Sequence, residues 1–150
     1  MVPIKVCIDA DACPVTNIAV ELCRKYQVAC YIFCDTAHAI FRDGADTVIV
    51  DQGADSADYA ITARVTANDI VITQDYGLAS MVLAKKARAL HQNGWEYTAD
   101  NIDALLFERH ESAKFRRGGG RLKGPSKRTA EQDAHFRSAL ESLLQKVFQG

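Results

Sequence analysis

Short apolar runs alternate along the chain with longer stretches in which apolar residues recur at helical spacing. The short runs are rich in β-branched residues, as buried strands are, and cover residues 4–9, 28–33, 47–50, 69–73 and a shorter run at 89–91. Helical spacing covers residues 15–26, 56–65 and 78–87, a stretch from Thr98 or Asp100 to about 107, and residues 129–148. This alternation predicts a three-layer α/β/α fold with a mostly parallel sheet.

Several helix ends carry sequence signals. Pro14 suits the first turn of a helix, and Ser56 is a predicted N-cap. Thr129 and Gln132 have the spacing of a capping box. The helix that follows them has apolar residues at helical intervals, namely Phe136, Leu140, Leu143, Leu144 and Val147. We therefore expect the helix at 129–148 to pack back on the body of a single domain that spans residues 1–150.

Composition narrows the class of protein. With 150 residues, of which 48% are apolar, the chain can bury one core without crosslinks. No apolar run approaches the roughly 20 residues that a membrane-spanning helix needs. The five cysteines are odd in number and lack zinc-site spacing, so we expect buried thiols in a reducing compartment and a cytoplasmic protein. Only Cys13 precedes a predicted helix start, where a thiol pKa is often lowered, but no histidine lies near it in sequence.

Charge is unevenly distributed. Residues 1–113 have a net charge of −7, whereas residues 114–128 contain seven Lys/Arg and no acidic residue. Four glycines and a proline predict that the segment from 116 to 128 is a loop. Its glycine-rich backbone could approach a phosphate chain closely. We therefore predict that the basic residues of this segment bind nucleic acid, namely Arg116, Arg117, Arg121, Lys123, Lys127 and Arg128. The alternative is a solvated surface loop. For the neighbouring Phe115, core packing is favoured over stacking on a base.

Aspartates gather where the predicted strands end. The carboxyl ends of parallel strands meet at one edge of a sheet, and ligands bind there. Asp9 and Asp11 follow the first strand, Asp55 and Asp58 follow the third, and Asp75 follows the fourth. Carboxylates without histidine or cysteine form an oxygen-rich site of the kind that binds Mg²⁺ or Mn²⁺. The alternative is that aspartates favour turns and helix starts, and we assign Asp35, Asp43, Asp46 and Asp69 to that role.

Four segments in order, DADACPV (9–15), DSADYAI (55–61), TQDYGLA (73–79) and GGRLKGPSKRT (119–129), resemble the uncharacterised bacterial YaiI/YqxD family. The acidic positions within them also resemble the pattern of PIN-domain nucleases. This resemblance implies a PIN-like fold and a metal-dependent ribonuclease. It places the acidic positions on Asp9, Asp58 and Asp75, with Thr73 supporting them and Asp11 or Asp55 as a further ligand. The usual middle acid is a glutamate rather than Asp58, which leaves open whether one ion or two would bind.

Three function classes follow. The first is a nuclease that hydrolyses RNA with Mg²⁺ or Mn²⁺, and the second is an RNA-binding protein with a vestigial metal site. The third is a phosphoesterase acting on a small phosphate or nucleotide, although residues 118–126 lack the ending of a Walker loop. His38 is a candidate proton carrier beside the acidic residues. The sequence leaves open whether the chain forms a homo-oligomer.

Overall fold

Five parallel strands form the central sheet of the structure, a computed structural model that describes residues 3–11, 13–53, 55–119 and 127–149. The strands are β1 (Lys5–Asp9), β2 (Ala29–Asp35), β3 (Asp46–Val50), β4 (Ile70–Ile72) and β5 (Arg88–Leu90). They lie in the order β3-β2-β1-β4-β5, and every neighbouring pair is parallel. The predicted parallel sheet is confirmed.

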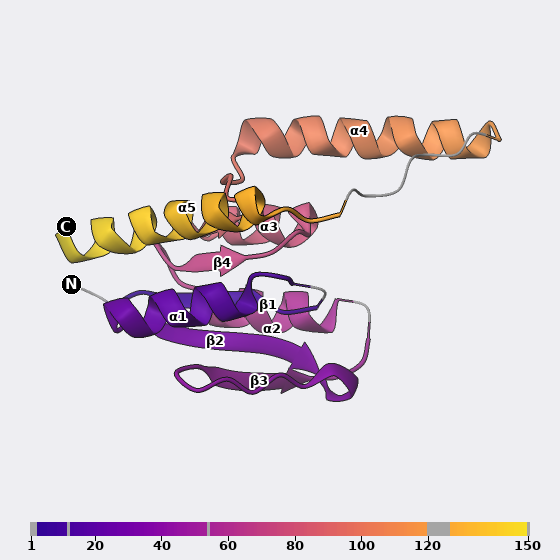
Figure 1. Cartoon of the computed structure of the whole chain (residues 1–150). Coiled ribbons are helices and arrows are strands. Elements are labelled where there is room, and N and C mark those ends of the chain that lie inside the picture. Colours follow the sequence, from indigo (N-terminus) through magenta and orange to yellow (C-terminus); the bar gives the residue numbers. More distant parts are fainter. Residues whose placement is uncertain (1–2, 12, 54, 120–126, 150) are drawn as a thin grey trace.

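Helices cover both faces of this sheet (Figure 1). They are α1 (Thr16–Tyr26), the short 3₁₀ helix η1 (Thr36–His38), α2 (Ser56–Arg64), α3 (Tyr76–Ala84), α4 (Ala99–Arg117) and α5 (Ala130–Gln149). One core joins α1 and α5 to the sheet, and a second joins α2, α3 and the start of α4 to its other face. These three layers confirm the predicted α/β/α architecture and are consistent with a PIN-like fold.

The strand order creates a crevice beside β1. After β1 the chain moves outward through β2 and β3 and then returns to place β4 against the other side of β1. The helix after β1 packs on one face and the helix after β4 on the other, so the two connections diverge. Such a switch point opens a binding crevice at the carboxyl ends of the strands.

Two predicted helix starts were wrong. The residue at the N-cap of α2 is Asp55, not Ser56, and it has a left-handed backbone with a φ of 70° and no capping bond from its side chain. Helix α3 begins at Tyr76 rather than 78, because the Asp75 carboxylate accepts hydrogen bonds from the amides of Gly77 and Leu78. Both differences bring an aspartate to a helix start at the carboxyl edge.

The basic segment 114–128 is helical at residues 116 and 117, where we predicted that the loop begins. Helix α4 continues through Arg116 and Arg117, because residues 108–117 contain neither glycine nor proline, and a turn at Gly118 and Gly119 follows it. Core packing of Phe115 was also wrong, since this side chain is 51% exposed. Arg121 and Lys123 lie outside the described residues, as does the side chain of Arg116.

The last helix packs as predicted. The Thr129 amide donates to Gln132 Oε1 at 3.0 Å, and the Gln132 amide donates to Thr129 Oγ1 at 3.2 Å, which completes the capping box. Phe136, Leu140, Leu143 and Leu144 of α5 are buried, in a core shared with α1. Among the described residues, no helix is both long and apolar enough to cross a membrane.

Candidate functional site

The carboxyl edge of the sheet holds an open groove, which we call the acidic groove. It has a volume of about 400 Å³ and is lined by Asp9, Asp11, Gly53, Asp55, Ala57, Asp58, Gln74 and Asp75. Its acids come from the end of β1, the start of α2 and the start of α3. All five predicted metal-ligand candidates therefore line one cavity.

Thr73 holds two of these aspartates in place. Its side chain is 2% exposed, and its hydroxyl donates to Asp9 Oδ2 at 2.8 Å while accepting from the Asp75 amide at 3.0 Å. The Tyr97 hydroxyl donates to the Thr73 carbonyl at 3.1 Å and supports this arrangement from below. The sequence suggested the role of Thr73, but it did not suggest Tyr97, which lies 24 residues further along the chain.

Burial and neighbouring carboxylates raise the pKa of two acids of the groove, Asp9 and Asp58. The pKa of Asp9 is raised chiefly by burial and further by Asp75 and Asp11, against the opposing effect of the Thr73 hydroxyl. The pKa of Asp58 is raised to about 6 by burial and by the charges of Asp75, Asp9 and Asp55. Within the described part of the chain, no Lys or Arg forms an ion pair with any of these carboxylates.

The donor chemistry of the acidic groove suits a hard divalent cation, because every candidate ligand is an oxygen. A ready coordination shell is not formed, however. Among the described residues, no three acidic, histidine or cysteine side chains are grouped closely enough to hold an ion as they stand. One oxygen of Asp75 is engaged by the Gly77 and Leu78 amides. Side-chain rotation would therefore have to accompany metal binding.

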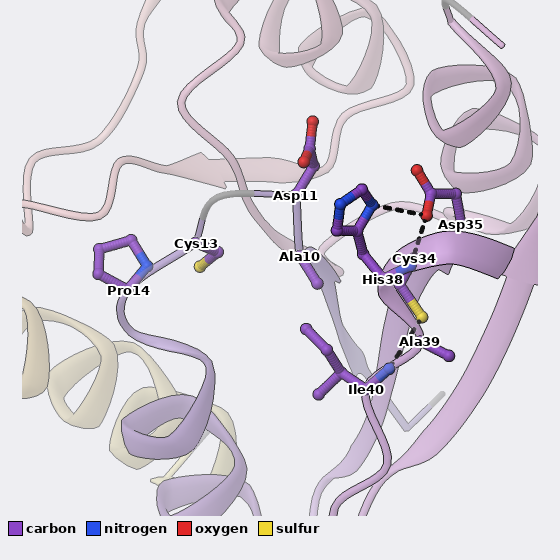
Figure 2. Close-up of a pocket in the computed structure, with 9 residues that line it drawn as sticks. All are labelled: Ala10, Asp11, Cys13, Pro14, Cys34, Asp35, His38, Ala39 and Ile40. Carbon is purple, nitrogen blue, oxygen red and sulfur yellow. Dashed lines mark hydrogen bonds and ion pairs between the residues drawn. The ribbon is translucent and has the colours of Figure 1, made fainter. Parts of the chain in front are cut away.

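A second hollow opens between the ends of β1 and β2, and Figure 2 shows the residues around it. This second hollow has a volume of about 470 Å³ and is lined by Ala10, Asp11, Cys13, Pro14, Cys34, Asp35, His38, Ala39 and Ile40. Asp11 lines both cavities, so they adjoin. Sequence reasoning missed this hollow and assigned Asp35 to a turn, although the spacing of Asp35 and His38 permits a local hydrogen bond.

The cysteines behave as buried apolar residues. All five are free, and Cys7, Cys23, Cys30 and Cys34 are buried while Cys13 is half-buried. The position of Cys13 near a helix start favours a lowered pKa, but burial dominates and raises the pKa of this thiol. Burial thus outweighs the effect that the nearby helix start would have on this thiol.

The described basic residues differ in their surroundings. Arg117 and Lys127 are exposed. The guanidinium of Arg128 instead donates from Nε to Asp133 Oδ1 at 2.6 Å, from Nη1 to Asn93 Oδ1 at 2.7 Å and from Nη2 to the Gln92 carbonyl at 2.6 Å. Arg128 thus ties the start of α5 to the turn after β5, and its contact with nucleic acid stays a prediction.

Comparison with known proteins assigns the family. The model of the uncharacterised YaiI/YqxD family matches residues 7–146. The chain belongs to the YaiI/YqxD family. No solved structure matches it significantly. The resemblance noted in the sequence is therefore confirmed at the level of the family.

Relatives in this family resemble the chain over nearly their whole length. A UPF0178 protein of Exiguobacterium sibiricum is 49% identical over 140 residues, which cover 93% of this chain and 96% of the relative. A UPF0178 protein of Lachnoclostridium phytofermentans is 42% identical over 146 residues, covering 95% and 98%. These names carry no activity, so function must be argued from the YaiI/YqxD protein's own residues.

Proposed function

We propose that this YaiI/YqxD protein is a metal-dependent nuclease that hydrolyses phosphodiester bonds in RNA, with Mg²⁺ or Mn²⁺ held by Asp9, Asp58 and Asp75. The observation that carries this proposal is the crowding of carboxylates in the acidic groove without an ion-paired cation among the described residues. Like charges held together repel, and a bound cation would relieve the repulsion. The repulsion between these carboxylates is consistent with a groove that binds a cation.

The residues of the groove would have distinct roles. A bound divalent cation would activate water and neutralise charge on the phosphodiester. Thr73 keeps Asp9 oriented toward the groove, and the start of α3 fixes Asp75. Asp58, whose pKa of about 6 belongs to the metal-free groove, would release its proton when the cation binds. Asp11 and Asp55 stand at the groove as further ligands.

Basic residues outside the groove would hold the nucleic-acid backbone. Arg117 and Lys127 are exposed, and in the sequence they stand on either side of the segment that contains Arg121 and Lys123. Contacts of this kind bind phosphates without reading sequence and weaken as salt rises. RNA is favoured over DNA on the family resemblance to PIN domains. The free thiols suit a cytoplasmic location, which we include in the proposal.

A second candidate is an RNA-binding protein with a vestigial metal site. The observation that favours it is the lack of a preformed group of three ligands among the described residues. The use of Asp75 as a helix cap agrees with it, since a cap gives that aspartate a structural reason to be present. RNA binding that survives Asp9→Asn but weakens in Arg121→Gln would support this candidate.

Cleavage of single-stranded RNA by the purified protein with added Mn²⁺ tests the proposal. Asp9→Asn and Asp75→Asn keep side-chain shape but remove a ligand charge, so each should lower cleavage by roughly 100-fold or more. Asp103→Asn on the exposed face of α4 is the matched control and should cleave like the wild type. Intact RNA with the wild type, or equal cleavage by all four proteins, would contradict a nuclease that uses these residues.

A further inference from the structure

The geometry points to the second hollow as a binding site for the base and ribose of a nucleotide that neighbours the bound phosphate, with His38 as its polar contact. This inference rests on the proposed function for the position of the phosphate in the acidic groove. The second hollow is lined by residues that do not line the acidic groove, with the exception of Asp11. It can therefore be tested without a metal and without cleavage.

The position of the second hollow fits a strand of nucleic acid crossing the carboxyl edge. Asp9 pairs in register with Phe33 of the adjacent β2, and Asp35 ends that strand. The acidic groove lies between the end of β1 and the starts of α2 and α3, and the second hollow lies between the ends of β1 and β2, so the two cavities meet at Asp11. A nucleotide whose phosphate lies at Asp9 would place the next sugar and base near Asp11 and beyond it.

The lining of the second hollow suits an uncharged, flat ligand. Ala10, Pro14, Ala39 and Ile40 give it apolar walls, and Figure 2 shows Cys13 and Pro14 across from the segment 34–40. Its polar groups are few, as in small-molecule sites, and they include two carboxylates, Asp11 and Asp35. Those two negative charges disfavour a phosphate in this hollow. A ribose with its base is uncharged, and the base is flat.

The ring of His38 is held by Asp35. Asp35 Oδ1 accepts from the His38 amide at 2.8 Å and lies 2.9 Å from His38 Nδ1. The hydrogen bond from His38 lowers the pKa of Asp35, so this carboxylate is ionised and can only accept. Nδ1 then donates to Asp35, and when the ring carries this one proton Nε2 is an acceptor. Figure 2 shows this second nitrogen turned toward Asp11 and the hollow, where it can accept from a ribose hydroxyl or an amino group.

Titration of the isotope-labelled protein with uridine and adenosine, followed by amide NMR without added metal, tests the inference. We expect shifts confined to Ala10, Asp11 and Cys13 and to residues 34–40 around the second hollow. His38→Ala should weaken nucleoside binding about fivefold, as expected for loss of one hydrogen bond. Asp35→Asn, which loosens the ring but leaves it present, should weaken binding less. His110→Ala on α4 is the matched control, because His110 is likewise exposed, and should leave binding unchanged.

The outcomes separate this inference from the proposed nuclease. RNA cleavage by the wild type without nucleoside shifts around the hollow would overturn the subsite and leave the nuclease standing. Shifts that His38→Ala leaves unchanged, or the same shifts produced by inorganic phosphate alone, would also overturn it. Nucleoside binding that depends on His38, in a protein that cleaves no RNA, would support the site while contradicting the nuclease.

Discussion

One buried aspartate at the amino edge of the sheet and the partly exposed aspartates of the acidic groove at its carboxyl edge differ in the partners that the fold gives them. At the amino edge, Asp69 is 1% exposed and accepts from the Lys5 amide at 3.0 Å, Lys5 Nζ at 2.7 Å, the Thr66 amide at 2.8 Å and the Thr66 hydroxyl at 3.0 Å. At the carboxyl edge, Asp9 accepts from Thr73 and faces other carboxylates. Among the described residues, Asp69 has an ion-pair partner in Lys5, whereas Asp9 has none.

The pKa values of the aspartates shift in opposite directions at the two edges. Burial alone would raise the pKa of Asp69, but the hydrogen bonds from Lys5 and Thr66 outweigh it and lower the pKa. The pKa values of Asp9 and Asp58 are raised, because burial and like charges outweigh their few partners. Asp69 thus has a hydrogen-bond or ion-pair partner on both carboxylate oxygens. The contrast supports the view that the carboxyl edge needs a ligand that the chain does not supply.

Asp69→Asn should give the largest change in stability. The amide would turn a donor toward groups that already donate and leave Lys5 without its partner, so we expect a loss of about 2 kcal/mol in the free energy of unfolding. Because the pKa of Asp69 is lowered, its contribution is complete above the ordinary aspartate pKa and is lost as pH falls through the lower folded value. Chemical denaturation at pH 7 against Asp103→Asn measures it, and an unchanged midpoint would contradict this role.

Metal affinity should fall with acid. Asp58, with a pKa of about 6, must lose its proton to bind a cation, so the apparent affinity for Mn²⁺ should drop about tenfold from pH 7.5 to pH 5. Calorimetric titration at the two pH values measures this drop. In Asp58→Asn the remaining dependence should be shallower, since the titrating group is gone. An equal affinity at both pH values in the wild type would show that Asp58 is not a ligand.

Asp58→Asn should change the free energy of unfolding least. It should stabilise the metal-free protein, whereas Asp69→Asn should destabilise it. A raised folded pKa disfavours the ionised native state, so the stability of the wild type falls as pH rises from the ordinary aspartate pKa to about 6. After solvent screening is allowed for, the metal-free variant should be about 1 kcal/mol more stable at pH 7.5 and equal to the wild type at pH 3. Thermal melts with a chelator test this, and destabilisation at pH 7.5 would contradict crowding as the cause.

The fold and the acidic groove could be predicted because both follow from local patterns. Runs such as residues 69–73 indicate buried parallel strands, and parallel strands bring Asp9 and Asp75 to one edge whatever the details of the helices. The separation between Asp69 and Asp75 also followed, since one lies at the start of its strand and the other after its end. The ion pair of Asp69 with Lys5 could not be predicted from the sequence, because the two residues lie 64 positions apart.

Other features depend on tertiary contacts that no local pattern contains. The second hollow requires the segments around Cys13 and His38 to meet, and Tyr97 reaches Thr73 only because β5 lies beside β4. Helix α4 continues past Phe107 without a buried face to signal it, so hydrophobic spacing underestimated its length. Phe115 lies in this exposed part of α4, so its assignment to the core was wrong.

Calorimetric titration of the metal-free protein with Mn²⁺ at pH 7.5, wild type beside Asp75→Asn, tests most directly whether the acidic groove binds a cation. Asparagine can still cap α3, so this variant removes a charge while keeping the helix start. We predict saturable binding in the wild type and in the Asp103→Asn control, and a loss of at least about tenfold in Asp75→Asn. No binding in the wild type, or equal binding in all three proteins, would contradict the account.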